Sequence, residues 1–165
     1  MVLLSGVPAS GKSYFGSWLE DHKSFLHIDA EKDGRLLEQG LLPLWDSCFQ
    51  GGNPAALVNA LQALNRPVAF NWGFPTCWLP VVEAMKREGF DIWWFDADRN
   101  AARRAFARRG DVPLHAFDKQ IADIARDWSK IKKVFSPNIM RTLKSNGAYT
   151  EPAEIYRKIF GSTNM

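Results

Sequence analysis

Eight residues near the N-terminus have the types and the spacing that binding a triphosphate requires. The segment Gly6-Val7-Pro8-Ala9-Ser10-Gly11-Lys12-Ser13 has two glycines, a lysine and a serine in the pattern G-x-x-x-x-G-K-S. The glycines let the main chain turn tightly, so that successive N–H groups can point at phosphate oxygens. The lysine supplies a positive charge for the outer phosphates, and the serine hydroxyl is a ligand type that suits Mg²⁺. The segment therefore predicts a nucleoside triphosphate site that extends to Tyr14, with Ser13 as the metal ligand.

The residues on either side of this segment are those of a strand and a helix. The apolar run Val2–Leu4 precedes it, and residues 13–21 follow with Phe15, Trp18 and Leu19 spaced for one helix face. A helix that starts at the loop would direct its unpaired N–H groups and its dipole at the phosphates. This strand–loop–helix order is the context that the motif needs.

Asp29 ends a second apolar run, residues 24–29. If this strand runs parallel to the first, its carboxyl end faces the γ-phosphate, where a carboxylate can accept the proton of an attacking hydroxyl. We therefore predict that Asp29 is the general base. The alternative is an aspartate that caps the following turn. His27, two residues earlier, fits a partly buried structural histidine.

Five arginines fall within one predicted helix, residues 99–109. Arg104 and Arg108 are neighbours at i, i+4, and guanidinium groups at that spacing can fork onto phosphate oxygens. The break at Gly110 and Pro113 suits a hinge. We predict a helical lid over approximately residues 98–118, with Arg104 and Arg108 as catalytic groups beside Lys12. A solvated basic face is the alternative.

Asn71 ends the third predicted strand, residues 68–71, and is either a weak, indirect metal ligand or an amide that bonds local backbone. Aromatic side chains that could stack on a base or cover an apolar substrate surround it in the sequence: Trp45, Phe49, Trp72, Phe74 and Trp78.

Apolar strand-like runs alternate with helix-like segments along the whole chain. Further strands are predicted at residues 90–95 and 139–143, and helices at 55–64, 76–88, 121–135 and 152–160. Such alternation is typical of an α/β fold with a parallel sheet covered on both faces. With 165 residues, we expect a single domain over residues 1–165. Ligands of such sheets bind beyond the carboxyl ends of the strands.

The composition is that of an ordinary globular protein. The net charge of +3 suits phosphorylated ligands and does not indicate a surface that coats nucleic acid. Cys48 and Cys77 lack the spacing of a metal site, so we expect free thiols in a reducing compartment. No apolar run approaches ~20 residues and the N-terminus does not resemble a signal peptide, so we expect a cytoplasmic protein without a membrane contact.

Three elements together resemble small P-loop kinases: the loop 6–13, Asp29 at a strand end, and the arginine-rich segment 99–113. The most similar group contains polynucleotide 5′-hydroxyl kinases, zeta-toxin-like kinases and gluconate kinases. The resemblance implies a three-layer α/β/α P-loop NTPase fold with a five-stranded parallel sheet in the order 2-3-1-4-5. It also implies ATP and Mg²⁺ as ligands, and places residues 145–147 near the adenine. Asn71 departs from the group, where an acidic residue is frequent at this place.

The function that we expect is transfer of the γ-phosphoryl of ATP to a hydroxyl of a small molecule, a nucleoside or a nucleic-acid end. The alternative is a nucleotide-gated regulatory module without an acceptor. The sequence speaks against a GTPase of this kind, because neither an Asp-x-x-Gly nor an Asn-Lys-x-Asp motif follows the loop. The acceptor, the preferred nucleobase and the oligomeric state stay open.

Overall fold

A computed structural model describes residues 1–32, 34–51, 53–110 and 112–161. Its centre is a five-stranded sheet in the order β2-β3-β1-β4-β5, in which every neighbouring pair is parallel. The strands are β1 (Val2–Gly6), β2 (Leu26–Asp29), β3 (Val68–Asn71), β4 (Asp91–Ala97) and β5 (Ile139–Leu143). The predicted fold class and strand order are therefore confirmed.

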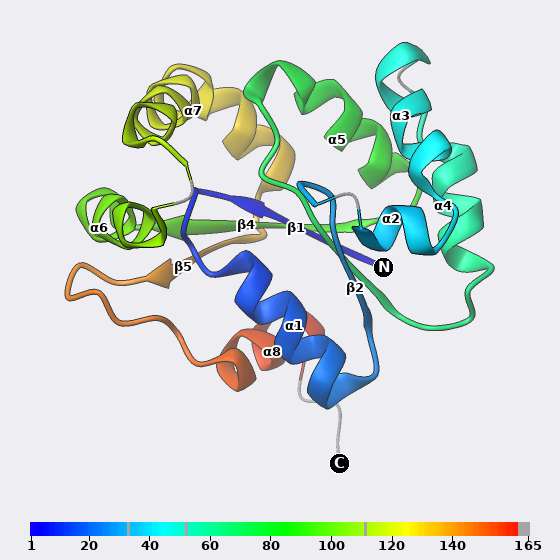
Figure 1. Ribbon diagram of the computed structural model, residues 1–165, viewed down its shortest axis with the longest axis horizontal. Coiled ribbons are helices and arrows are strands. Elements are labelled where there is room, and N and C mark those ends of the chain that lie inside the picture. The colour runs from blue at the N-terminus through cyan, green and yellow to red at the C-terminus, as the bar shows by residue number, and fades with distance from the viewer. Residues whose placement is uncertain (33, 52, 111, 162–165) are drawn as a thin grey trace.

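Helices cover both faces of the sheet (Figure 1). On one face lie α1 (Lys12–Lys23) and α8 (Pro152–Phe160), and on the other α3 (Leu42–Gly51), α4 (Ala55–Gln62), α5 (Leu79–Arg87) and α7 (Leu114–Phe135). The remaining helices are α2 (Gly34–Glu38), η1 (Thr76–Trp78) and α6 (Arg99–Arg109). The sequence patterns did not predict α2 and α3. None of the helices in the described ranges is long and apolar enough to cross a membrane.

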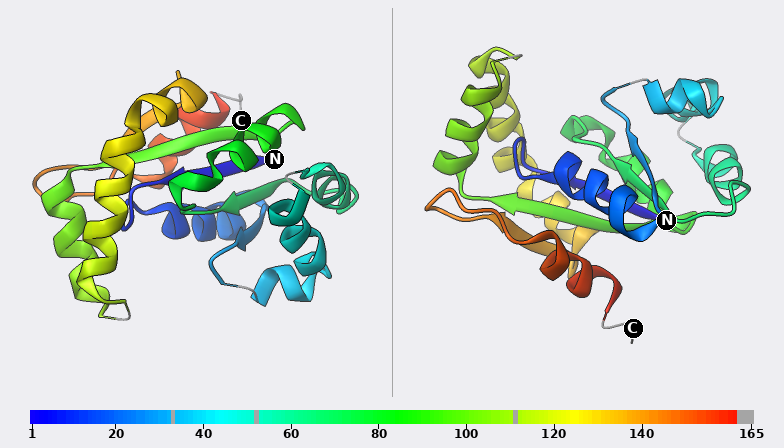
Figure 2. Two further views of the ribbon diagram at one scale, coloured as in Figure 1. Left: turned by 90° about the horizontal axis from the view of Figure 1, so that it is seen from above. Right: turned by 60° about the horizontal axis from the view of Figure 1, so that its bottom comes forward.

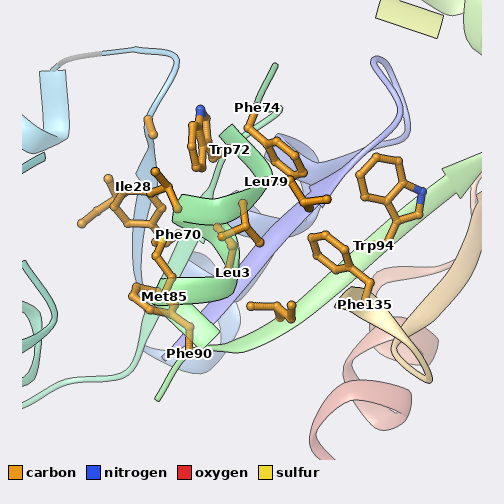
Figure 3. Close-up of a cluster of buried hydrophobic side chains, with 14 of the residues drawn as sticks. Leu3, Ile28, Phe70, Trp72, Phe74, Leu79, Met85, Phe90, Trp94 and Phe135 are labelled. Atoms are coloured by element: carbon orange, nitrogen blue, oxygen red, sulfur yellow. The ribbon is translucent and has the colours of Figure 1, made fainter. Parts of the chain in front are cut away.

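Each face of the sheet has its own apolar core, because successive side chains of a strand point to opposite faces. Leu3 packs into the core under α4, α5 and α7, whereas Val2 and Leu4 pack into the core under α1 and α8. Figure 3 shows the larger core, with Leu3 and Phe70 among aromatic and aliphatic side chains. Strands that are buried on both faces have no polar side to alternate with, which explains why the central strands β1, β3 and β4 contain continuous apolar runs.

Gly6 lets the chain leave β1 and enter the phosphate loop. Its φ is +140°, and a Cβ at this position would lie 2.1 Å from the carbonyl oxygen of Phe95 in β4. The next amide, of Val7, donates a hydrogen bond to that same oxygen at 3.0 Å. Glycine is required here both by the backbone conformation and by the close approach of β4.

Asp98 caps α6, since its carboxylate accepts a hydrogen bond from the amide of Ala101 at 2.9 Å. Thr76 does not cap the helix that follows it. Its hydroxyl instead donates to Asp127 of α7 at 2.7 Å, because α7 packs beside this turn and offers a carboxylate. Residue 111, within the predicted break after α6, lies outside the described residues.

Candidate functional site

The predicted phosphate loop lies between the carboxyl end of β1 and the first turn of α1. The side chain of Lys12 folds back over the loop, where its ammonium group donates to the carbonyl of Val7 at 3.0 Å and to that of Gly6 at 3.5 Å. Ala9 has a φ of +60° and Gly11 a φ of +93°, so the backbone of the loop is left-handed at these two residues. This conformation is a nest of main-chain amides that ends at a helix N-terminus, which is a suitable site for phosphate.

Two hydroxyl groups from the C-terminal part of the chain hold this loop from outside. Thr142 of β5 donates to the carbonyl of Ser10 at 2.7 Å, and Tyr149 donates to the carbonyl of Ala9 at 2.9 Å. The C=O and N–H of a trans peptide point in opposite directions. Fixing the Ser10 carbonyl outward therefore turns the Gly11 amide toward the inside of the loop.

Ser13 lies between two polar side chains that end neighbouring strands. Its hydroxyl donates to Asp29 at 3.1 Å and accepts from the amide group of Asn71 at 2.9 Å. β2 and β3 are adjacent, and Asp29 and Asn71 are register partners, so both side chains reach the same edge of the sheet. The structure thus brings together the predicted metal ligand, the predicted base and the residue whose role the sequence left open.

This cluster fits a hydrated magnesium ion that is bound together with a nucleotide. The side-chain oxygen of Asn71 is buried and has no hydrogen-bond partner among the residues that the structure describes, so it is free to accept from a metal-bound water. Ser13 and Asp29 supply the oxygen ligands that Mg²⁺ prefers. No group of three or more acidic, histidine or cysteine side chains suited to a metal occurs within the described ranges. A metal here would therefore depend on the nucleotide's own phosphates for further ligands.

A cavity of about 200 Å³ opens from the inside of the loop. Apart from loop residues, its walls come from the turn after β2, the turn after β3, α6, the segment between α6 and α7, and α7. The residues are Glu31, Gly73, Phe106, Arg109, Val112, Ala116 and Gln120. Glu31 is fixed at this place because its carboxylate accepts a hydrogen bond from the amide of Gly73 at 3.0 Å. Glu31 belongs to no motif in the sequence, and its one signal is that it is a second carboxylate two positions after Asp29.

The charged side chains around Lys12 shift its pKa in opposite directions, and its burial lowers it. Burial lowers the pKa of Lys12 from 10.5 to about 8, the carboxylate of Glu31 raises it, Arg109 lowers it and Asp29 raises it. The ammonium group is therefore held where water solvates it poorly. A phosphate group that enters the cavity supplies the negative charge that restores its ordinary preference for the protonated form.

The arginines of α6 are not equivalent. Arg109 lines the cavity, whereas Arg104 donates to the carbonyl of Ser145 at 3.4 Å and Arg103 pairs with Asp118 of α7. Phe106, three residues before Arg109, also lines the cavity and packs on Phe117 of α7. The cavity-facing side of α6 thus carries Arg109. Neither Arg104 nor Arg108 is among the described residues that line this cavity, so their predicted catalytic role stays a prediction.

We expect Arg109→Ala to weaken the binding of a triphosphate in this cavity by about 10- to 100-fold, because it removes a charged hydrogen-bond donor from the cavity. Arg108→Ala is the matched control on the same helix, with an expected change below about twofold. Titration calorimetry of both variants with MgATP measures the difference. A loss for Arg108→Ala as large as that for Arg109→Ala would instead support the role that the i, i+4 spacing predicts for Arg104 and Arg108.

The aromatic side chains near Asn71 do not form a platform for a base. Trp72 is 6% exposed, and its ring packs edge-on against those of Trp45 and Phe49. Phe49 packs in the same way on Trp78, and Figure 3 shows Phe74 within the core. These rings fill the space between the sheet and α3, a helix that the sequence patterns did not predict. The suggestion that they stack on a ligand was wrong.

Asp29 also borders a second cavity, of about 370 Å³, on the other side of Ser13. His27 and Ser17 lie in its wall, and His27 packs so closely on α1 that a Cβ at Gly16 would lie 2.3 Å from its Nε2. Burial lowers the pKa of His27, which favours the neutral ring. His27 is buried as the sequence predicts, and its Nε2 has no hydrogen-bond partner among the described residues. Asp29 is not among the described residues that line the cavity around Lys12.

Comparisons with known proteins support the fold at low sequence identity. No protein-family model matches the sequence, and no curated protein matches it significantly. A gluconokinase from Sinorhizobium meliloti 1021 superposes with a TM-score of 0.55 at 15% identity, over 97% of this chain and 89% of that one. A shikimate kinase from Bacteroides thetaiotaomicron superposes with a TM-score of 0.52 at 15% identity, over 85% and 84%. Both likenesses show that the chain shares the overall fold of these two structures.

Proposed function

We propose that this protein transfers the γ-phosphoryl group of ATP to a hydroxyl group of a small molecule. One observation carries the proposal: a single cavity combines the lysine and serine of a phosphate loop with a carboxylate and an arginine from other elements. The loop suits the donor triphosphate. Glu31 and Arg109 are the groups that an acceptor hydroxyl and a transferred phosphoryl group need.

On the donor side, the amides of the loop and Lys12 bind the β- and γ-phosphates. Ser13 and Asp29, with Asn71 behind them, would hold Mg²⁺, which neutralises charge on the phosphate oxygens. Asp29 orients the Ser13 hydroxyl through the hydrogen bond at 3.1 Å. This hydrogen bond favours a role for Asp29 in holding the metal. So does the position of Asp29, which lines the cavity of about 370 Å³ and not the one that holds Lys12.

On the acceptor side, we assign the base to Glu31, because its carboxylate lies in the same cavity as Lys12 and Arg109. The acceptor oxygen attacks the γ-phosphorus while its proton passes to Glu31, and the bond from the γ-phosphorus to the β,γ-bridging oxygen breaks to release ADP. Arg109 and Lys12 stabilise the charge on the transferred group. The assignment of the base to Asp29 stays a prediction that competes with this one.

The size of the cavity favours a small acceptor. A volume of about 200 Å³ must hold the end of the triphosphate as well as the acceptor hydroxyl. The two similar structures are named for kinases of shikimate and gluconate, which are small molecules. A nucleic-acid end is less favoured as the acceptor, because the aromatic rings that could stack on bases are buried in the core or packed against it. We take α6 and the first turns of α7, which lie side by side in Figure 2, as the lid of a single-domain enzyme.

An acceptor screen tests this proposal. ADP release from MgATP is measured across a panel of sugar acids, polyols, nucleosides and hydroxylated carboxylic acids, and a phosphorylated product is identified by mass spectrometry. We expect turnover that depends on one class of acceptor and is negligible without it. ATP hydrolysis that is independent of every acceptor and rises with a protein partner would instead indicate the nucleotide-gated regulatory module.

A further inference from the structure

A cavity of about 220 Å³, the side cavity, adjoins the one that holds Lys12. The two cavities share Gly73, Ala116 and Gln120 in their walls. Because the end of the triphosphate takes part of the first cavity, an acceptor whose hydroxyl reaches Glu31 has room for its remaining atoms at this junction. The junction bears on the acceptor only if the proposed function holds, because that function makes Glu31 the base and the loop the donor site.

The polar groups at the junction suit hydroxyl groups. The side-chain amide of Gln120 donates to the carbonyl of Gly73 at 3.4 Å, and the main-chain amide of Gly73 donates to Glu31 at 3.0 Å. A Cβ on Gly73 would overlap the carboxylate of Glu31 and lie 3.9 Å from the Nε2 of Gln120, so the three residues meet. The contact of Gln120 is long for a hydrogen bond, so a ligand hydroxyl can replace it. An amide group both donates and accepts, as a hydroxyl does.

The rest of the wall is apolar. Phe106, Val112 and Ala116 form it, and the ring of Phe106 packs on Phe117 of α7 with the ring centroids 5.2 Å apart. The C–H groups of a carbohydrate can pack on such a surface while its hydroxyl groups bind to an amide and a carboxylate.

The cations near the junction are already engaged. Lys12 and Arg109 border the first cavity, where the phosphoryl group takes their charge. Lys119 lines the side cavity but pairs with Asp123 at 2.8 Å. Lys32 lines the cavity of about 370 Å³ instead, and the other arginines of α6 line neither of these two cavities. Among the residues that the structure describes, none is therefore left to bind an acidic group of the acceptor.

The segments around the carboxyl ends of β2 and β3 are poor in positive charge. Between Arg35 and Lys86, the only lysine or arginine of the sequence is Arg66. Arg66 donates to two carbonyls just before β2, at the opposite end of that strand. Arg35 pairs with Glu20 and Glu38. A carboxylate on the acceptor would thus lie near the charge of the proposed base without a counter-charge of its own, which is unfavourable.

We propose that the acceptor is an uncharged polyhydroxyl compound, a sugar or a polyol, which the amide of Gln120 and the carboxylate of Glu31 bind through neighbouring hydroxyl groups. One of these hydroxyls loses its proton to Glu31 as its oxygen bonds to the γ-phosphorus and ADP leaves. The product is a phosphate monoester of the sugar or polyol.

Matched pairs of acceptors test this proposal. In each pair an uncharged CH₂OH group replaces a carboxylate: glycerol and glycerate, erythritol and erythronate, glucitol and gluconate, glucose and glucuronate. ADP release from MgATP gives kcat/KM for every compound. We expect the uncharged member of the pair that is used to exceed its acid by at least about tenfold, because the acid lacks a cationic partner. An acid that is used as well as its uncharged partner, or better, would overturn the proposal.

One substitution should change this preference in a stated direction. Gln120→Lys places a cation at the junction, so it should raise the ratio of acid to uncharged turnover by at least about tenfold. Ala122→Lys is the control, since it adds the same charge to an exposed position of α7 that lines neither cavity. A ratio that Gln120→Lys leaves unchanged would contradict the placement of the acceptor beside Gln120.

The outcomes separate this inference from the proposed function. If acids are phosphorylated in preference to their uncharged partners, the proposed function stands and only the inference fails. If calorimetry shows that MgATP binds but no member of any pair is phosphorylated, the inference fails together with the proposed transfer to a small hydroxyl compound.

Discussion

Lys12→Met is expected to lower kcat/KM for MgATP by about 10³-fold, because it removes the one cation that the loop itself directs at the phosphates. Methionine has a similar length and stays compatible with the burial of this side chain, so the fold should persist. Lys158→Met on α8 is the control, since it removes the same charge from an exposed residue that does not line the cavity. Kinetics with the identified acceptor and calorimetry of MgATP binding measure the effect.

The same side chain predicts how nucleotide affinity depends on pH. In the free protein the pKa of Lys12 is about 8, so the ammonium group loses its proton above this pH. A bound triphosphate favours the charged form and raises that pKa. The affinity for MgATP should therefore fall as pH rises above about 8, by up to tenfold per pH unit, until the pKa of the complex is reached. Lys12→Met should lack this dependence, and an affinity of the wild-type protein that is flat from pH 7 to 10 would contradict the role of Lys12.

Glu31→Gln is expected to lower kcat by about 10²- to 10⁴-fold while the affinity for MgATP changes little. Glutamine keeps an oxygen that can accept from the Gly73 amide, so the side chain should stay in place and lose only its capacity to take a proton. Single-turnover kinetics at saturating MgATP measure the chemical step.

Asp29→Asn is the matched variant and should have a different kinetic signature. It weakens the contact with the Ser13 hydroxyl and removes a charge beside the proposed metal site, so the Mg²⁺ concentration for half-maximal activity should rise. The opposite result, a loss of kcat for Asp29→Asn at saturating Mg²⁺ with Glu31→Gln nearly unaffected, would return the role of the base to Asp29.

The parts of the site that were predicted correctly depend on short-range patterns. The phosphate loop is continuous in sequence and needs only a strand before it and a helix after it, and both are present. The strand order followed from a resemblance, and the continuously apolar strands independently required a parallel sheet with two covered faces. The proximity of Asp29 and Asn71 to Ser13 then follows from the parallel register of β2 with β3.

The parts that were missed depend on contacts between distant segments. A period of 3.6 residues shows which arginines of α6 share a face, but only the packing of Phe106 on Phe117 shows which face meets the loop, and it is the face of Arg109. Likewise, the aromatic residues around Trp72 looked exposed as long as α3, which covers them, was not recognised. That helix has ten residues, among which Asp46, Ser47 and Gln50 mark the exposed side, and it carries Pro43 near its start and Gly51 at its end, so its pattern is short and lies between helix-breaking residues.

The hydroxyl groups of Thr142 and Tyr149 place a constraint on how the protein is made. They hold the carbonyls of Ser10 and Ala9, and they lie 132 and 140 positions later in the chain. During translation, a nascent chain emerges N-terminus first, so the loop leaves the ribosome long before these two side chains do. If the loop binds ATP as proposed, full affinity should therefore require that residues 139–149 have been synthesised and docked, and nucleotide should contribute little to the earlier steps of folding.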